Sequence, residues 1–271
     1  MCENKVPSLN SNLKGEIDLR LKDKVCIVTG SSMGIGEAIS ERFAEEGAKV
    51  VVNSRSQERA DQTARSLREK GYEVCAIAAD MANKQSVENL VATTIQKYGQ
   101  IDVFVNNAGI NRIGPSMALS EEDWKAVLDT NLSGVFFGCQ EAGKAMEKVG
   151  GGSIINITSV YGQVCVPMRA AYSSTKHGMI GLTKVLAVEW AEKNIRVNAV
   201  APAYIKTPLD ETDQEAGGYD DQDVVRRTPL RRFGTTKEVA DVVLFLATDE
   251  SSYVTGTTYN VDGGWVAYGG W

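Results

Sequence analysis

Short apolar runs alternate with longer amphipathic segments along most of the chain. The runs predicted to be strands span residues 25–30, 49–55, 73–80, 101–109, 153–160, 195–202 and 257–264. The segments predicted to be helices span residues 36–46, 58–70, 86–98, 121–148, 171–193 and 236–247. Strands that are apolar on both faces and alternate with helices indicate a parallel sheet covered on both sides. The pattern therefore predicts one α/β domain with a doubly wound, seven-stranded parallel sheet and helices on both faces.

Two segments depart from this rhythm. Residues 1–22 show little periodicity, and we interpret them as an N-terminal extension ahead of a domain over residues 23–271. The second segment, at about residues 207–229, follows a strand and carries the acidic residues Asp210, Glu211, Asp213, Glu215, Asp220, Asp221 and Asp223. Long loops at the carboxyl ends of parallel strands lie where ligands bind. We therefore expect this segment to be a loop over a ligand site.

Composition and charge narrow the class of protein. Apolar residues make up 43% and charged residues 24% of the 271 residues, as is typical of globular proteins. The net charge of −6 argues against a nucleic-acid binder that depends on phosphate contacts. No apolar stretch is long enough to cross a membrane, and the N-terminus lacks the apolar segment of a secretion signal. A cytoplasmic location is therefore expected.

Cysteine and histidine usage excludes two kinds of site. The cysteines at positions 2, 26, 75, 139 and 165 are scattered without CxxC spacing, which favours free thiols over a disulfide framework. His177 is the single histidine, so we expect no metal site. A serine hydrolase is also disfavoured, because no GxSxG sequence is present.

A glycine-rich turn follows the first predicted strand. Residues 29–36 read TGSSMGIG, with glycines at 30, 34 and 36. In a strand–turn–helix unit, such glycines let the backbone approach a pyrophosphate at a helix N-terminus, as in Rossmann-type domains. The alternative is a glycine-rich turn without a ligand, but its position after the first strand of a parallel sheet favours dinucleotide binding.

The end of the second predicted strand bears on the choice of dinucleotide. An acid is usual at this position in NAD sites, where it binds the ribose 2′-hydroxyl, whereas an arginine accommodates a 2′-phosphate. Ser54 takes the position of the acid and Arg55 follows it. This favours NADP over NAD, unless Arg55 lies only on a solvated surface.

Tyr172 and Lys176 are four residues apart on a predicted helix, and hence on one face of it. A nearby ammonium group stabilises a phenolate and lowers the pKa of the tyrosine, so such a pair can exchange a proton with an alcohol. Taken alone, the YxxxK pattern is as well explained by a half-buried tyrosine beside a solvated lysine. Ser159 and Asn131 support a catalytic role only because they occur together with this pair.

Taken together, these features resemble the short-chain dehydrogenase/reductase family over roughly residues 22–264. The resemblance rests on the glycine-rich turn, Asp80, NNAG at 106–109, Asn131, Ser159, YSSTK at 172–176 and APAYIKT at 201–207. It implies an oxidoreductase that moves a hydride between a nicotinamide cofactor and an alcohol/ketone pair. It also implies a homotetramer.

The resemblance assigns roles to individual residues. Tyr172 is expected to be the acid/base, Lys176 to lower its pKa and bind the ribose, Ser159 to bind the substrate oxygen, and Asn131 to hold a proton-relaying water. The residues expected to bind the cofactor, with Tyr172 and Lys176, are Gly30, Ser32, Met33, Ile35, Ser54, Arg55, Asp80, Met81, Asn107, Ala108, Gly109, Pro202, Ile205 and Thr207. The residues expected to form the substrate pocket are Ser159, Tyr161, Gln163, Val164, Met168 and Tyr204.

Two positions depart from the family pattern. Ala203 stands where many members have glycine, which implies a slightly different turn. Met33 stands where many NADP-specific members carry a basic residue. NADP(H) is therefore expected to be preferred, with use of NAD(H) left open.

The acidic residues at 207–229 suggest a substrate class. An acidic loop disfavours strongly anionic partners, so a neutral carbonyl compound, polyol or sugar is expected, unless the acids form only a solvated surface. The alternatives are a 3-oxoacyl thioester reductase, a cofactor-binding regulator without turnover, and an isomerase or dehydratase that uses the same tyrosine.

Overall fold

The parallel sheet predicted from the sequence is the centre of the molecule. The computed structural model describes residues 19–207, 213–214 and 216–270, and within them a seven-stranded sheet has the order β3-β2-β1-β4-β5-β6-β7. Every described pair of neighbouring strands is parallel. The strands are β1 (Val25–Val28), β2 (Lys49–Ser54), β3 (Val74–Ala78), β4 (Val103–Asn106), β5 (Gly152–Ile157), β6 (Ile195–Pro202) and β7 (Thr258–Val261). This confirms the predicted fold class.

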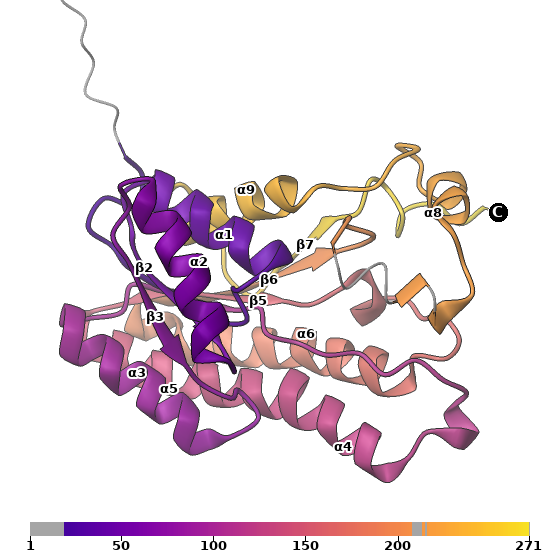
Figure 1. Ribbon diagram of the computed structural model, residues 1–271, viewed down its shortest axis with the longest axis horizontal. Helices are drawn as coiled ribbons and strands as arrows, with labels where there is room; N and C mark the ends of the chain where they lie inside the picture. The colour runs from indigo at the N-terminus through magenta and orange to yellow at the C-terminus, as the bar shows by residue number, and fades with distance from the viewer. Residues whose placement is uncertain (1–18, 208–212, 215, 271) are drawn as a thin grey trace, which may run out of the picture.

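Helices cover both faces of the sheet, as Figure 1 shows with α1 and α9 above it and α3, α5 and α6 below. The longer helices are α1 (Gly34–Glu45), α2 (Gln57–Glu69), α3 (Lys84–Tyr98), α4 (Glu121–Leu128), α5 (Gly134–Val149), α6 (Ala170–Trp190) and α9 (Thr236–Ala247). Successive strand residues face opposite sides: Cys26 and Val28 pack with α1, α2 and α9, whereas Ile27 packs with α3, α5 and α6. Both faces are therefore apolar.

The strand order places a ligand-binding crevice in the fold. The chain builds β1, β2 and β3 outward in one direction, then returns past β1 to form β4 and continues the other way. The connections that follow β1 and β4 therefore leave the sheet on opposite sides, which opens a crevice at the carboxyl ends of these strands. The glycine-rich turn and the NNAG segment both begin there.

One predicted helix is two helices joined by a wider turn. The sequence pattern predicts a continuous helix over 121–148, but a π-helical turn, Asp129–Ser133, separates α4 from α5. α5 runs very close to the sheet, because a Cβ atom added to Gly138 would lie 2.3 Å from Oδ1 of Asn106. π-helical turns recur at functional sites, and this one contains Asn131.

The start of the domain lies earlier than the predicted residue 23. Leu21 is only 1% exposed and packs with the core beside α1. Its N–H donates to the carbonyl of Glu46 at 3.0 Å, and the Arg20 guanidinium pairs with the Glu46 carboxylate at 2.6 Å. At least residues 19–22 therefore belong to the folded domain, while residues 1–18 lie outside the described residues.

The predicted loop over 207–229 contains a helix, α8 (Asp221–Arg227). Its N-cap is Asp220, whose carboxylate accepts from the N–H of Asp223 while the Asp223 carboxylate accepts from the N–H of Asp220. This reciprocal capping box explains why a short acidic stretch becomes helical. Residues 208–212 and 215 lie outside the described residues.

Two further findings bear on the expectations from composition. The four cysteines within the described residues are free. No helix in the described part of the chain is long and apolar enough to span a membrane.

The packing of α5 against the sheet gives a prediction. We expect Gly138→Ala to lower the unfolding free energy by about 1–3 kcal/mol, because the added methyl group must displace Asn106 or Phe104. Gly181→Ala on α6 is the matched control, since nothing lies within 4 Å of the added Cβ and alanine favours a helix. Thermal unfolding of both variants and the wild type is the measurement. Equal melting temperatures for all three would contradict the predicted close packing.

Candidate active site

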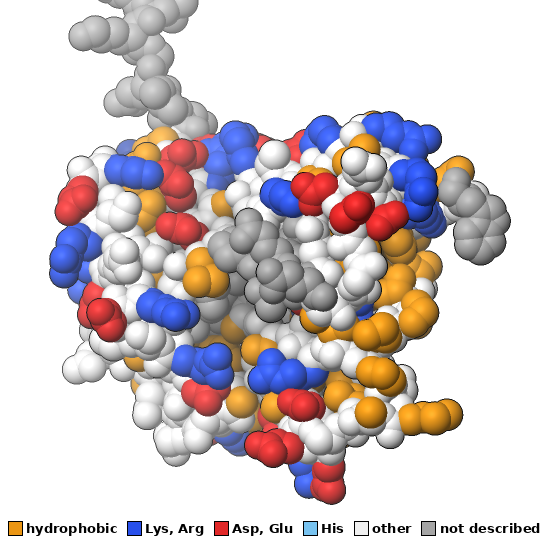
Figure 2. Space-filling model, turned by 45° about the vertical axis from the view of Figure 1, so that its right-hand side comes forward, with side chains coloured by type: hydrophobic (Ala, Val, Ile, Leu, Met, Phe, Trp, Pro, Cys, Tyr) orange, Lys and Arg blue, Asp and Glu red, His pale blue; other side chains and the backbone are white. Residues whose placement is uncertain are grey.

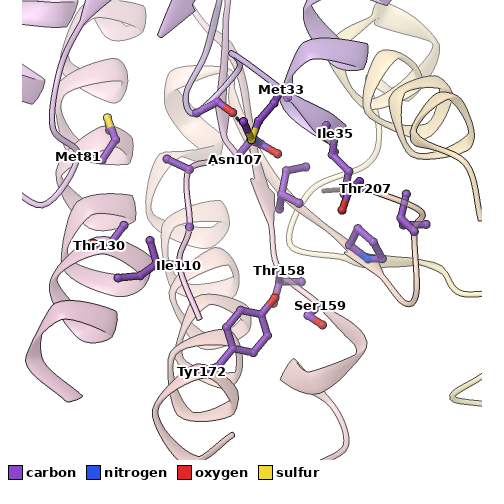
Figure 3. Close-up of a pocket in the computed structure, with 18 of the residues that line it drawn as sticks. Met33, Ile35, Met81, Asn107, Ile110, Thr130, Thr158, Ser159, Tyr172 and Thr207 are labelled. Carbon is purple, nitrogen blue, oxygen red and sulfur yellow. Dashed lines mark hydrogen bonds between the residues drawn. The ribbon is translucent and has the colours of Figure 1, made fainter. Parts of the chain in front are cut away.

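A cavity of about 500 Å³ occupies the crevice at the carboxyl ends of the strands. Figure 3 shows Met33 and Asn107 at one end of this cavity and Ser159 and Tyr172 at the other. The cavity thus joins the glycine-rich turn after β1 to the residues that follow β5 and to α6. Its length and position suit a dinucleotide that extends from the turn toward Tyr172.

The glycines of the turn are required by close backbone approaches. A Cβ atom on Gly30 would lie 2.8 Å from Cα of Ala108, and Gly30 has a φ of +60°. A Cβ atom on Gly36 would lie 2.4 Å from Nδ2 of Asn107. That nitrogen donates to the carbonyls of Thr29 and Gly30 at 2.9 and 3.0 Å, which fixes the turn.

The residues at this turn fit a pyrophosphate group. Helix α1 begins after Met33, which offers no side-chain cap to the first N–H groups of the helix. Uncapped N–H groups at a helix N-terminus attract an anion. Both Met33 and Gly34 line the cavity, so these donors lie at its wall.

Two arginines lie at the end of β2. Arg55 and Arg59 both line the cavity, and among the described residues neither has a carboxylate within ion-pair distance. Ser56 caps α2 between them, and its Oγ accepts from the N–H of Arg59. Arg59 was missed by sequence reasoning. The signal was available, because two arginines four residues apart at a helix start can face the same way.

Ser159, Tyr172 and Lys176 come together from two elements. Ser159 follows β5, and Tyr172 and Lys176 lie one turn apart on α6. Nζ of Lys176 donates to the carbonyl of Ile157 at 2.8 Å and lies 5.4 Å from the centre of the Tyr172 ring. Ser159 and Tyr172 both line the cavity. The structure therefore gathers these three predicted residues at one end of the cavity.

Burial dominates the electrostatics of this group. It raises the pKa of Tyr172 to about 12, against a smaller lowering by Ser159. The expected lowering of this pKa by Lys176 stays a prediction. Burial also lowers the pKa of Lys176 to about 7. Desolvation shifts both pKa values, because the low-polarity surroundings disfavour every charged form.

Asn131 lies outside the cavity lining. Its side-chain oxygen accepts from the N–H of Ile110 at 2.8 Å, and its side-chain nitrogen donates to the Ile110 carbonyl at 2.8 Å. Ile110 lines the cavity, so Asn131 fixes one of its walls from behind. The expected water-holding role stays a prediction.

All of the predicted cofactor residues line the cavity, from Gly30 in the turn to Thr207 after β6. Of the predicted substrate residues, Ser159, Tyr161 and Tyr204 line it, whereas Gln163, Val164 and Met168 do not. The side chain of Gln163 instead bonds to Asn260. Their distance from Ser159 in the sequence did not predict their positions, because the chain turns at Val160–Gly162 and leads away from the cavity.

Aromatic rings enclose the end of the cavity beyond Tyr172. The hydroxyls of Tyr161 and Tyr204 lie 2.6 Å apart, and the Tyr161 ring packs edge-on against Tyr172 and Trp265. Sequence reasoning missed Arg169, Asp213 and Tyr219, which also line this end. Arg169 lies three residues before Tyr172, but nothing in its sequence context distinguishes it from a surface arginine.

The four acids that the structure describes in the 207–229 segment do not form a negative lining. Asp221 pairs with Lys206, Asp223 pairs with Arg226, and Asp220 caps α8. Figure 2 shows acidic side chains interleaved with lysine and arginine on the surface. Of the acids in the described part of this segment, Asp213 alone lines the cavity. These described acids therefore give no support to the electrostatic argument for a neutral substrate.

A dinucleotide-shaped crevice with a tyrosine, a serine and a lysine at one end defines a class, the nucleotide-dependent oxidoreductases. Residues 30–266 match a family model described as "Enoyl-(Acyl carrier protein) reductase". The chain belongs to the short-chain dehydrogenase/reductase family, as its sequence predicted.

Sequence and structure comparisons agree on this family. The chain is 44% identical to the 3-oxoacyl-[acyl-carrier-protein] reductase FabG of Thermotoga maritima, over 92% of this chain and all of that protein. It is similar, with a TM-score of 0.88 and 35% identity, to a gluconate 5-dehydrogenase from Burkholderia cenocepacia in complex with NADP and tartrate, covering 93% of this chain and 98% of that one. It is equally similar, at 36% identity and a TM-score of 0.88, to an actinorhodin polyketide ketoreductase variant with NADPH, covering 91% and 98%.

The lowered pKa of Lys176 gives a prediction for stability. Between about pH 7 and the ordinary lysine pKa of 10.5, the unfolded chain binds more protons than the folded one. This contribution therefore makes the unfolding free energy rise with pH across that window and is lost as the pH falls toward 7. We expect Lys176→Met to flatten the rise, which melting temperatures across this range measure.

Lys184→Met is the control, because the Lys184 side chain is exposed on the same helix. It should leave the pH dependence of the wild type unchanged. If Lys176→Met and the wild type show the same slope, Lys176 is not desolvated as described.

Proposed function

We propose that the chain is an NADP(H)-dependent oxidoreductase that interconverts a ketone and a secondary alcohol. The observation that carries this proposal is the grouping of Ser159, Tyr172 and Lys176 at one end of a cavity whose other end fits a pyrophosphate. When bound, the nicotinamide cofactor supplies the hydride, and the protein supplies orientation and the proton.

The surroundings of Tyr172 favour the reduction of a ketone. Because burial raises its pKa to about 12, Tyr172 keeps its proton at neutral pH and acts as a general acid. The hydroxyls of Ser159 and Tyr172 both donate to the carbonyl oxygen, and Tyr172 passes its proton to that oxygen as negative charge develops there. Lys176 donates to the Ile157 carbonyl and so holds the backbone beside Tyr172.

Arg55 and Arg59 support a preference for NADP(H). Both lie at the cavity wall after β2, where a ribose 2′-phosphate would be bound, and two guanidinium groups suit a phosphate better than a hydroxyl. Structural neighbours named as complexes with NADP and NADPH point the same way. The two arginines and these neighbours together outweigh the argument against NADP(H) from Met33, which stands where a basic residue is common.

The sequence relatives favour a 3-oxoacyl thioester as the substrate, the alternative raised above, over a neutral polyol or sugar. Proteins 41–44% identical to this chain are named 3-oxoacyl-[acyl-carrier-protein] reductases. A second candidate is a hydroxy acid, because a neighbour is named a gluconate 5-dehydrogenase and Arg169 lines the substrate end of the cavity.

Exposed apolar side chains support the proposed homotetramer. Phe136 on α5 is 40% exposed, and Val185 and Val188 on α6 are 54% and 80% exposed. Apolar side chains that gather on helix faces commonly mark contacts between subunits. A cytoplasmic location also stays a prediction.

The roles proposed here predict the behaviour of one variant. Tyr172→Phe should lower kcat for NADPH-dependent reduction of a 3-oxoacyl thioester by roughly a hundredfold to ten-thousandfold, because the proton donor is lost. NADPH affinity should persist, because the ring remains. NADPH absorbance and a cofactor titration are the measurements. Cofactor binding without any turnover in the wild type would instead favour a regulator, and turnover without net NADPH consumption an isomerase or dehydratase.

The two arginines after β2 predict cofactor selectivity. Arg55→Ala and Arg59→Ala should each raise KM for NADPH by about tenfold or more and leave KM for NADH nearly unchanged, because each removes a charge-assisted hydrogen bond to the 2′-phosphate. Arg65→Ala is the control, since Arg65 is exposed on α2 and lies outside the cavity lining. Equal losses with both cofactors would rule out 2′-phosphate recognition by these side chains.

A further inference from the structure

Arg169 is a buried cation at the substrate end of the cavity. It precedes the first residue of α6, three positions before Tyr172, and is only 5% exposed. Its guanidinium carbon lies 5.7 Å from the ring centres of both Tyr161 and Tyr219. These rings hold the planar group in one orientation at the cavity wall.

One nitrogen of the Arg169 guanidinium lacks an acceptor among the described residues. Nε is buried, and none of the described residues accepts a hydrogen bond from it. Among these residues, the carboxylate within ion-pair distance belongs to Asp213, whose Oδ2 lies 3.9 Å from Nη2. That distance is too long for a hydrogen bond. The same oxygen already accepts from Nδ2 of Asn111 at 2.9 Å.

A buried guanidinium with an unmade hydrogen bond is costly for the folded protein. A guanidinium without a carboxylate within hydrogen-bond distance can bind the carboxylate of a ligand, whose two oxygens match two adjacent N–H groups. Because Arg169 lines the same cavity as Tyr172, the ligand that meets it is the one whose carbonyl faces Tyr172.

We propose that Arg169 binds a carboxylate group of the substrate and so selects an oxo acid or hydroxy acid. This inference rests on the proposed ketone–alcohol interconversion and takes the second substrate candidate, the hydroxy acid, over the 3-oxoacyl thioester. Arg169 is a specificity-determining residue, because it holds the part of the substrate that does not react.

The charges around Arg169 favour a singly charged carboxylate over a phosphate. Asp213 lies beside Arg169 and opposes a second negative charge. Lys176 supplies little compensation, because its Nζ donates to the Ile157 carbonyl and burial lowers its pKa to about 7. Lys206 pairs with Asp221. The site therefore suits a ligand group with one negative charge.

Matched pairs of ketones test this proposal. The substrates are 3-oxobutanoate, 4-oxopentanoate and 5-oxohexanoate, each beside its methyl ester, with the acetoacetyl thioester of N-acetylcysteamine as a neutral thioester. In the wild type, at least one oxo acid should exceed its ester in kcat/KM by more than about tenfold, mainly through a lower KM. NADPH consumption is the readout.

Arg169→Met should remove this preference by raising KM for the acid far more than KM for the ester. Arg169→Lys keeps the charge without the planar fork, so it should keep part of the preference, and it carries the test if the methionine variant does not fold. Asp213→Asn should increase the preference, because it removes a competing carboxylate. Arg65→Met is the control outside the cavity.

Two outcomes overturn the proposal: a wild type that prefers the neutral ester or thioester at every chain length, or an Arg169→Met variant that loses activity on acid and ester equally. Absence of turnover with every ketone would instead count against the proposed function. Isothermal titration of the wild type and Arg169→Met with the oxo acids, in the presence of NADP⁺, then decides the role of Arg169. Binding that Arg169→Met weakens supports it, and equal or absent binding overturns it.

Discussion

The crevice depends on a hydrogen-bonded connection between the ends of β1 and β4, with Thr29 at its centre. The buried Thr29 hydroxyl accepts the N–H groups of Asn107 and Ala108 at 2.9 and 3.0 Å and donates to the Val105 carbonyl at 3.2 Å. This fully used hydroxyl draws the two chain segments together. Gly30 then faces Ala108 without room for a side chain, and both residues line the cavity.

The sheet could be predicted because strands buried on both faces must be apolar throughout, which leaves a plain signal in the sequence. The break between α4 and α5 could not, because it depends on the tertiary contact between Asn131 and Ile110. The packing of Leu21 likewise depends on Glu46, a residue distant in the sequence. α8 had a local signal in the capping pair Asp220 and Asp223, which the acidity of the segment concealed.

The candidate site was predictable where spacing alone brings groups together, as for Tyr172 and Lys176 on one turn of α6. It was not predictable where burial decides the outcome. Desolvation sets the pKa values of both residues. Arg169 is buried because aromatic rings pack around it. The surface pairing of Asp221 and Asp223 near α8 was likewise not visible in the sequence, and these two acids do not line the cavity.

The π-helical turn at Asp129–Ser133 changes the phase between two helices. One extra residue in a helix rotates everything that follows by about 100° around the axis. Asn131 can therefore face Ile110 while Val135 and Cys139, further along, still face the core below the sheet. A single-residue deletion in this turn would force a choice between these two alignments. This turn should thus tolerate substitutions more readily than insertions or deletions.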